Sequence, residues 1–319
     1  MLNNKKNCPT TIGGQALIEG IMMRGPFKTA VSIRLPDKQI STECIETNYL
    51  SDEYKIFKKP IIRGFASLID SLKIGYKSLS ISAEKSGMVE EEERNQSSFE
   101  KWLNEKLGDK VMSAIMVIST LLGIALAILL FLVLPTFIYN TISSVIPPEV
   151  DTLVLRSIIE GIMRILIFVA YIAVCSLMPD IHRVFSYHGA EHKTIFCYEA
   201  GEELTVENVK KYKRFHPRCG TSFLIIMLLI SIVIGFFIPA INPWIRSIIK
   251  ILCIPVVVSL GYELIRFCGK YDNVITKIIS APGLWIQRIT TKEPEDDMIQ
   301  VAIEALKAVI PPNNEDKVI

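Results

Sequence analysis

The sequence predicts a mainly α-helical, polytopic membrane protein with four transmembrane helices, a small α+β N-terminal region, and a helical cytoplasmic loop and tail. Three observations support this fold class. Half of the 319 residues are hydrophobic and concentrate in four long stretches. Apolar and polar residues alternate in parts of the first 60 positions. Finally, 30 of the 35 Lys and Arg residues lie in segments that would share one side of a membrane.

The N-terminal segment is predicted to contain a β-hairpin. The stretches AVSIRL and ISTECIET alternate apolar and polar residues on either side of Pro36, Asp37 and Lys38, which is typical of two strands joined by a turn. The preceding stretch IGGQALIEGIMMRGP is rich in glycine but contains neither GxGxxG nor GKS/T. We therefore expect tight turns there rather than a nucleotide-binding loop.

A helix is predicted for residues 63–83, which ends the N-terminal region (residues 1–83). Its apolar residues recur at helical spacing: Phe65, Leu68, Ile69, Leu72, Tyr76 and Leu79. Lys73 and Lys77 lie away from that face, so the helix could rest on the membrane surface or pack against its own domain. Residues 84–110 are predicted to form an acidic linker and a pre-membrane helix.

The apolar stretches predict transmembrane helices at residues 111–139, 153–178, 222–240 and 248–267. The first and third contain no charged residue, and a helix needs about 20 apolar residues to cross a bilayer core. These spans and a loop at residues 179–221 form the predicted membrane domain, residues 111–267. The tail, residues 268–319, is expected to be helical, with a last helix that begins near Pro294 and three acidic residues.

The distribution of basic residues predicts the orientation of the chain. Lys and Arg collect on the cytoplasmic side of membrane proteins. This rule places the N-terminal region, the 179–221 loop and the tail in the cytoplasm, and therefore both termini. The start, MLNNKKNCPTT, lacks an apolar core, so we expect no cleaved signal peptide.

Composition also limits the partners of the chain. The formal net charge of +2 argues against a nucleic-acid-binding protein, which is usually far more basic. The expected partner is the lipid bilayer; a homo-oligomer is compatible with the sequence, which specifies no protein partner. The seven cysteines contain no CxxC pair and most lie on the predicted cytoplasmic side, so we expect no disulfide bonds.

The histidines form a candidate metal-binding motif. All four lie between His182 and His216, in the predicted central loop. His188, Glu191 and His192 form an H-x-x-E-H pattern, which on a helix places the three side chains on one face. Two imidazoles one turn apart can bind a divalent metal ion, and the glutamate can act as general base toward a water molecule that the metal activates. We therefore predict a metal site, with Zn²⁺ as the expected ion.

A further ligand is predicted from the sequence HPRC at residues 216–219. His216 offers an imidazole and Cys219 a thiolate, and either would complete a catalytic site with an open position for water. If both bound together with His188 and His192, the site would be a closed, structural zinc site. Other candidate ligands near the cytoplasmic membrane face are Asp180, His182, Glu199 and Glu263.

Charged residues inside the second expected span form another group. Arg156, Glu160 and Arg164 are spaced four residues apart and line one side of a helix. Charges within a membrane usually face the interior of a bundle or a cavity. The stripe is therefore either a self-satisfied ion cluster or a binding site for an anionic headgroup or substrate in the outer half of the membrane.

Four blocks of the sequence closely resemble the YqhQ-like family of bacterial membrane proteins. These blocks are IGGQALIEGIMMRGP, RVFSYHGAEHKTIFCYEAGEELTVENV, FHPRCGTSFL and APGLWIQRITTKEPEDDMIQVAIEAL. The family carries a domain of unknown function and the label of a predicted metal-dependent enzyme. The resemblance implies a multi-pass protein of the bacterial inner membrane, and its motifs fall on His188, Glu191, His192, His216, Arg218 and Cys219.

These observations lead to two functional hypotheses of different classes. In the first, the protein is a metal-dependent hydrolase that acts at the cytoplasmic membrane face on a membrane-associated peptide or lipid. Glu191 would be its general base, and Arg218 would stabilise an oxyanion. In the second, the protein is a non-catalytic membrane scaffold or carrier, and its metal is structural.

Overall fold

The computed structural model describes residues 9–45, 49–60, 62–87, 117–147, 152–239, 242–271, 273–312 and 316. The chain divides into two compact units, which are described separately. The first comprises Met1–Gly87, Ile172–Met227 and Val258–Ile319, and the second comprises Met88–Tyr171 and Leu228–Val257. One boundary follows Gly87, and the other three fall within helices: α6 (Leu153–Cys175), α9 (Gly220–Gly235) and α11 (Ile254–Lys270).

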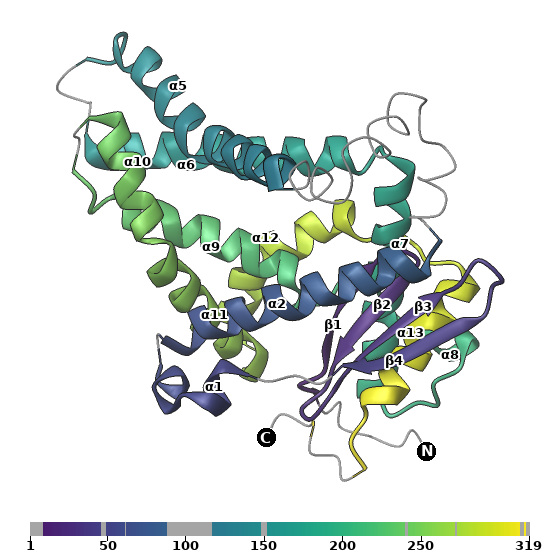
Figure 1. The fold of residues 1–319 in the computed structure, drawn as a ribbon. Coiled ribbons are helices and arrows are strands. Elements are labelled where there is room, and N and C mark those ends of the chain that lie inside the picture. Colours follow the sequence, from purple (N-terminus) through teal and green to yellow (C-terminus); the bar gives the residue numbers. More distant parts are fainter. Residues whose placement is uncertain are drawn as a thin grey trace, which may run out of the picture. The chain divides into compact units, whose positions relative to one another are not determined.

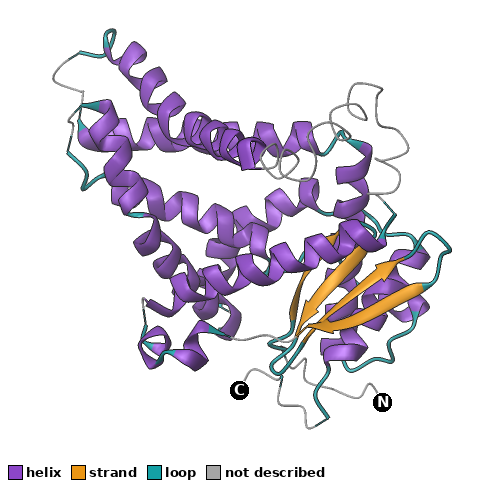
Figure 2. Ribbon diagram, viewed as in Figure 1, coloured by secondary structure: helices purple, strands orange, loops and turns teal. Residues whose placement is uncertain are grey.

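The first unit contains a four-stranded antiparallel sheet whose strands follow one another in sequence order (Figures 1 and 2). The strands are β1 (Gly13–Leu17), β2 (Gly20–Arg24), β3 (Thr29–Arg34) and β4 (Ile40–Ile45). Arg34 pairs with Ile40 across the predicted turn, which confirms the hairpin. Because the order is sequential, β1 and β4 are the edge strands.

The glycine-rich segment forms strands as well as turns. Gly13 and Gly14 lie inside β1 and pair with Arg24 and Met23 of β2, so they do not form the expected turn. The turn lies after Leu17, where Glu19 has a φ of 49°. The physical reason is that small residues are tolerated in an edge strand when other groups approach the backbone closely.

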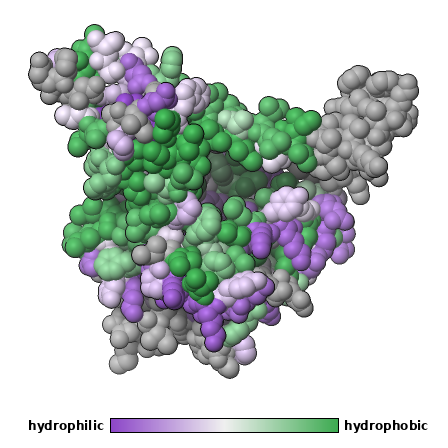
Figure 3. All heavy atoms as spheres, turned by 60° about the vertical axis from the view of Figure 1, so that its left-hand side comes forward, coloured by the Kyte–Doolittle hydropathy of each residue, from purple (hydrophilic) through white to green (hydrophobic). Residues whose placement is uncertain are grey.

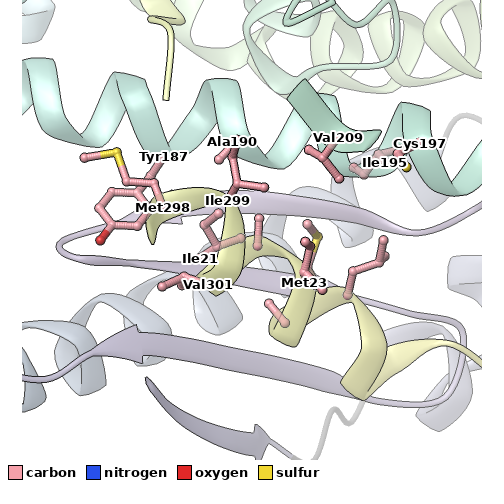
Figure 4. Packing of buried hydrophobic residues seen from close by; sticks show 14 of the residues in the cluster. Ile21, Met23, Tyr187, Ala190, Ile195, Cys197, Val209, Met298, Ile299 and Val301 are labelled. Atoms are coloured by element: carbon pink, nitrogen blue, oxygen red, sulfur yellow. The ribbon is translucent and has the colours of Figure 1, made fainter. Parts of the chain in front are cut away.

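Helices cover both faces of the sheet. On one face, α2 (Ile62–Lys85) packs against a hydrophobic cluster through Ile74. On the other face lie α7 (Pro179–Glu199) and α13 (Asp296–Val309). Figure 4 shows Ile21 and Met23 of the sheet packed against Tyr187 and Ala190 of α7 and residues of α13. The remaining helical elements of this unit are α1 (Leu50–Glu53), the 3-10 helix η1 (Lys55–Lys58), α8 (Val206–Lys210) and α12 (Val274–Thr290).

The structure confirms the predicted helix at residues 63–83 but assigns its packing to a different face. The buried residues of α2 are mostly small or polar: Gly64, Ala66, Asp70, Ile74, Gly75, Ser78 and Ser82. Leu72 and Tyr76, which belong to the predicted apolar face, are 63% and 77% exposed. Small residues are selected because they allow a helix to approach a sheet closely: a Cβ on Gly75 would lie 2.7 Å from Oε1 of Gln15.

The described residues of the second unit are helical and strongly apolar. Its helices include Val117–Ser143, in which a π-helical turn (η2, Leu129–Val133) precedes α5 (Leu134–Ser143), and α10 (Pro243–Leu252). A Cβ on Gly161 would lie 2.2 Å from Cγ1 of Ile232, so this glycine lets α6 and α9 approach closely. Hydrophobic side chains cover much of the face shown in Figure 3.

Two helices, Val117–Ser143 and Leu153–Cys175, are long and apolar enough to cross a membrane. The helices Trp244–Leu252 and Ile254–Lys270 meet at a bend of 45°, and they form a third span if the pair is counted as one. The sequence predicts one continuous helix at residues 248–267, and Pro255 explains the break, because proline fits only the first turn of a helix. Helix α9 is apolar but has 16 residues.

The packing of α2 predicts an unusual mutational pattern. Ser78→Leu should lower the melting temperature of the purified protein, because overpacking a buried site costs about 1–3 kcal/mol. Leu72→Ser should change the stability by less than about 0.5 kcal/mol, since Leu72 is exposed. Thermal unfolding in one detergent compares the two variants. Greater destabilisation by Leu72→Ser would contradict the assigned face.

Candidate metal centre

Helix α7 presents the H-x-x-E-H motif, as the spacing predicts. The helix runs from Pro179 to Glu199 without interruption. His188, Glu191 and His192 therefore share one face, and the two imidazole rings lie 4.4 Å apart between centroids. The neighbouring face of the same helix contributes Tyr187 and Ala190 to the hydrophobic core. The core thereby fixes the direction in which the motif points.

Backbone carbonyl groups fix the tautomers of both histidines. Nδ1 of His188 lies 2.9 Å from the carbonyl oxygen of Thr290, and Nδ1 of His192 lies 2.5 Å from that of Arg214. A carbonyl oxygen only accepts hydrogen bonds, so each Nδ1 must carry the proton. The Nε2 atoms are consequently available as metal ligands, in the arrangement that metal-binding histidines usually have.

Cys219 joins these two histidines from the start of α9. Its Sγ lies 3.1 Å from Nε2 of His188. One donor atom from each of His188, His192 and Cys219 can be chosen so that all three lie within 4.8 Å of one another. Burial alone would raise the pKa of the Cys219 thiol, but the neighbouring His192 and hydrogen bonds with His192 and Thr221 lower it. The net effect lowers the pKa of the thiol, which is the direction that favours metal binding.

Glu191 lies buried beside this group and is held by strand β1. Burial raises the pKa of its carboxyl to about 7, although His188 and a hydrogen bond from the Gly14 backbone act in the opposite direction. A Cβ on Gly14 would lie 3.0 Å from Cδ of Glu191. Gly14 therefore lets the backbone of β1 donate to the carboxylate at close range, a role that the sequence pattern did not reveal.

His216 and Arg218, both predicted site residues, belong to a neighbouring network. The His216 ring is 5.6 Å from the His192 ring, but its Nε2 lies 3.4 Å from the Arg218 guanidinium and 3.8 Å from the Glu199 carboxylate. Arg218 also forms an ion pair with Glu199 and donates to the carbonyl oxygen of Thr10 at 2.7 Å. His216 is thus outside the three-residue donor group, and Arg218 is held by Glu199 and Thr10.

Gln287 is a positioning residue that the sequence analysis missed. Its amide oxygen accepts from the backbone N–H of His216 at 2.7 Å, and its Nε2 donates to the carbonyl oxygen of His216 at 2.8 Å. Gln287 is fully buried, so these bonds fix the HPRC segment against α12. A glutamine within an amphipathic helix carries no local signal of such a role, because its partner is 71 residues away.

The donor group opens onto a cavity. A space of about 350 Å³ is lined by all three donor residues, by Glu191 and by His216. An adjoining cavity of about 640 Å³ is bordered by some of the same residues: Gly13, Gly14, Gln15, Arg218, Cys219 and Gly220. Strand β1 therefore runs along both cavities, and Gly14 is exposed there. The arrangement can admit a substrate to Glu191 and the donor atoms; metal binding itself stays a prediction.

The glycine of the H-G-A-E-H sequence has a packing role. A Cβ on Gly189 would lie 2.0 Å from the carbonyl oxygen of Lys292. The backbone N–H of Lys292 donates to the carbonyl oxygen of Phe185 at 2.8 Å, so the segment before α13 is held directly against α7. Gly189 thus places Thr290, the partner of His188, within reach.

Gly189→Ala should therefore destabilise the protein and disturb the His188 ring. A clash with backbone in a packed site costs about 1–3 kcal/mol, and thermal unfolding measures it. Gly13→Ala is the matched control, since nothing lies within 4 Å of a Cβ at that position. Equal stability of the two variants would contradict the close approach of Lys292.

Comparisons with known proteins agree with the sequence blocks described above. The family model described as "Protein of unknown function (DUF1385)" matches residues 59–312. The "Uncharacterized protein YqhQ" of Bacillus subtilis (strain 168) is 32% identical over 316 residues, covering 96% of this chain and 94% of the relative. No solved structure matches the chain significantly. The chain belongs to the DUF1385 family of YqhQ-like proteins.

Proposed function

We propose that the protein is a metal-dependent hydrolase at the cytoplasmic face of the bacterial inner membrane. The observation that carries this proposal is the donor group His188, His192 and Cys219, with the buried Glu191 carboxylate beside it. Three protein ligands and a neighbouring carboxylate are the composition of catalytic zinc sites, in which one coordination position stays open.

The residues of the donor group fit a Zn²⁺ ion chemically. His188 and His192 would bind through Nε2, because each Nδ1 is held by a carbonyl group. Cys219 would bind through its thiolate. Such an ion lowers the pKa of water and polarises a substrate carbonyl.

Glu191 and Arg218 would perform the remaining steps. The Glu191 carboxylate takes a proton from the attacking water and passes it to the leaving group. Gly14 holds that carboxylate through its backbone N–H, so the base is oriented before the substrate arrives. Arg218 borders both cavities and would stabilise negative charge that develops on the substrate oxygen.

The shape of the site favours a peptide substrate over a lipid. The N–H of Gly14 donates to Glu191, so the N–H and C=O groups of Gly14 point away from β2. Because backbone groups in a strand alternate with a period of two residues, the N–H and C=O groups of Ala16 point in the same direction. Because the Gly14 N–H is already bound to Glu191, β1 would offer an extended peptide the N–H of Ala16 and the carbonyl groups of Gly14 and Ala16. A segment paired with β1 would pass directly beside Glu191.

The proposed topology has four spans with both termini in the cytoplasm. The spans are Val117–Ser143, α6, α9 and the bent pair α10 and α11. Helix α9 is uncharged but covers only about 24 Å at 1.5 Å per residue, which local thinning of the bilayer can accommodate. The concentration of basic residues in the N-terminal region, the 179–221 loop and the tail supports the cytoplasmic location of the site.

The rival function is a scaffold or carrier with a structural metal. It would require His216 as a fourth ligand, and the ring of His216 is near enough to His192 to be considered. Against it, the nitrogens of His216 face Arg218 and Glu199. Substitution of Glu191 separates the two functions, because a structural site does not need a base.

We expect the purified wild-type protein to contain about one Zn²⁺ per chain, and the His188→Ala/His192→Ala variant almost none. Glu191→Gln should retain the metal and the melting temperature but lose turnover by about 10²–10⁴-fold, the usual contribution of a general base. Elemental analysis and thermal unfolding provide the first two readouts. Near-zero metal in both proteins would refute the metal site. An active Glu191→Gln variant that binds metal would refute Glu191 as the base, and a metal-loaded wild type without turnover would favour the rival.

The substrate class can be tested separately with a mixture of unstructured decapeptides and with phosphatidylglycerol vesicles. We expect the protein to cleave only the peptides, and mass spectrometry of the products measures this cleavage. Ala16→Pro removes an outward N–H of β1 and should raise KM about fivefold with little change in kcat, since one hydrogen bond is worth about 1 kcal/mol. Its metal content should equal that of the wild type. Hydrolysis of the lipid alone would overturn the peptide proposal.

A further inference from the structure

Five charged side chains share one cluster in the second unit, here called the Glu160 cluster. It consists of Glu160 with Arg156, Arg164, Arg246 and Lys250, which come from α6 and α10. Oε1 of Glu160 lies 3.1 Å from Arg156. Its Oε2 lies 3.6 Å from Arg164 and 3.7 Å from Arg246, and it forms an ion pair with Lys250. All but Arg156 have side chains less than 9% exposed, and Arg156 is 11% exposed.

The charges of the cluster do not balance. Four cations face one carboxylate, which leaves a formal charge of +3 in an apolar unit. Glu160 is the only acidic residue in the described parts of this unit, which are residues 117–147, 152–171, 228–239 and 242–257. A buried charge is tolerated only when it is paired. Among the described residues of this unit, the positive charge of the cluster is therefore not compensated.

The other partners of these cations are neutral. Arg164 donates from Nε to the carbonyl oxygen of Phe131 at 2.9 Å. Arg246 donates to Ser157 Oγ at 3.1 Å and to backbone carbonyl groups. Asn140 Oδ1 accepts from Arg156 at 3.0 Å. Such dipoles satisfy hydrogen bonds but leave the net charge unchanged.

Two donors of the cluster also lack an acceptor. Nη2 of Arg164 and Nε of Arg246 are buried and make no hydrogen bond to any described atom, although each lies within 4 Å of Glu160. An unsatisfied buried donor is costly, and one next to excess positive charge indicates that an anionic acceptor is missing.

We propose that the Glu160 cluster is a binding site for a phosphate group. Guanidinium groups match the oxygens of phosphate through paired hydrogen bonds, and a phosphate would supply both the missing charge and the missing acceptors. A phosphate would approach from the side of Arg156 and Asn140, because Asn140 is exposed and Arg156 is the least buried cation.

The surroundings of Arg156 and Asn140 suit a phosphate carried by a lipid. Phe137, Val154 and Ile158, which are near Asn140 and Arg156 in sequence, are 66%, 49% and 39% exposed. Apolar side chains at this level would contact acyl chains while the headgroup reaches the cations. This site is independent of the proposed metal centre, since all its residues belong to the other unit.

The proposal can be tested with the full-length protein in nanodiscs of a phosphorus-free galactolipid. Phosphatidylglycerol and inorganic phosphate are titrated separately, and the melting temperature reports binding. We expect phosphatidylglycerol to stabilise the wild type, and Arg164→Gln to weaken the apparent affinity at least tenfold. Arg266→Gln removes an equal charge at an exposed position outside the cluster and should respond as the wild type does.

Glu160→Gln provides an opposite expectation, which guards against misfolding of the arginine variant. Removal of the only carboxylate increases the need for an external anion, so this variant should gain more stability from phosphatidylglycerol than the wild type does. A response to phosphatidylglycerol alone identifies a lipid headgroup, and a response to both ligands identifies phosphate as such. No response of the wild type to either ligand, or equal responses of the wild type and Arg164→Gln, would overturn the proposal.

Discussion

Helix α7 must satisfy two demands at once, and the rest of the first unit is arranged around it. One face supplies Tyr187, Ala190, Ile195 and Cys197 to the hydrophobic core that it shares with the sheet and α13. The adjacent face carries two imidazoles and a carboxylate, none of which can be buried in apolar surroundings without partners. Three segments that touch this second face supply a polar partner: β1 through Gly14, the end of α12 through Thr290, and the segment before α9 through Arg214 and Cys219.

The core and the site are therefore coupled mechanically. Apolar packing determines the rotation of α7 about its axis, and that rotation determines where the imidazoles point. Gly189 has a special place in this coupling, because its missing side chain lets the chain between α12 and α13 contact α7. Thr290, the last residue of α12, then provides the carbonyl group that orients His188. Rigid backbone partners of this kind position donor atoms before a ligand binds.

The two units contain buried polar groups of opposite character. In the first unit, the Nδ1 atoms of two histidines are bound by carbonyl groups, and the remaining donor atoms of the group, two imidazole nitrogens and a sulfur, are of the kinds that bind a cation. In the second, the Glu160 cluster has an excess of cations suited to an anion. Both groups lie among apolar helices or core residues, where electrostatic interactions are stronger than in water. The chain thus combines two polar centres with contrasting preferences.

Local patterns in the sequence were sufficient for much of the fold. The hairpin between β3 and β4, the helices α2 and α13, and the helical placement of the H-x-x-E-H motif all follow from periodicity and turn residues. The family was also identified from short blocks. These features depend on neighbours within a few positions, and a sequence records such neighbours directly.

Tertiary structure decided the features that depend on distant partners. The packing face of α2 is lined by small residues because a close approach to the sheet outweighs hydrophobicity there. Cys219, rather than His216, joins the donor group, and the backbone of His216 is held by the amide of Gln287, 71 residues away. The stripe of Arg156, Glu160 and Arg164 gained two further cations from α10, which periodicity within α6 cannot indicate. The sequence by itself therefore indicated which side chains are candidates for the two polar groups, and only the fold determined which of them meet, because contacts across 30 to 90 positions arise from packing.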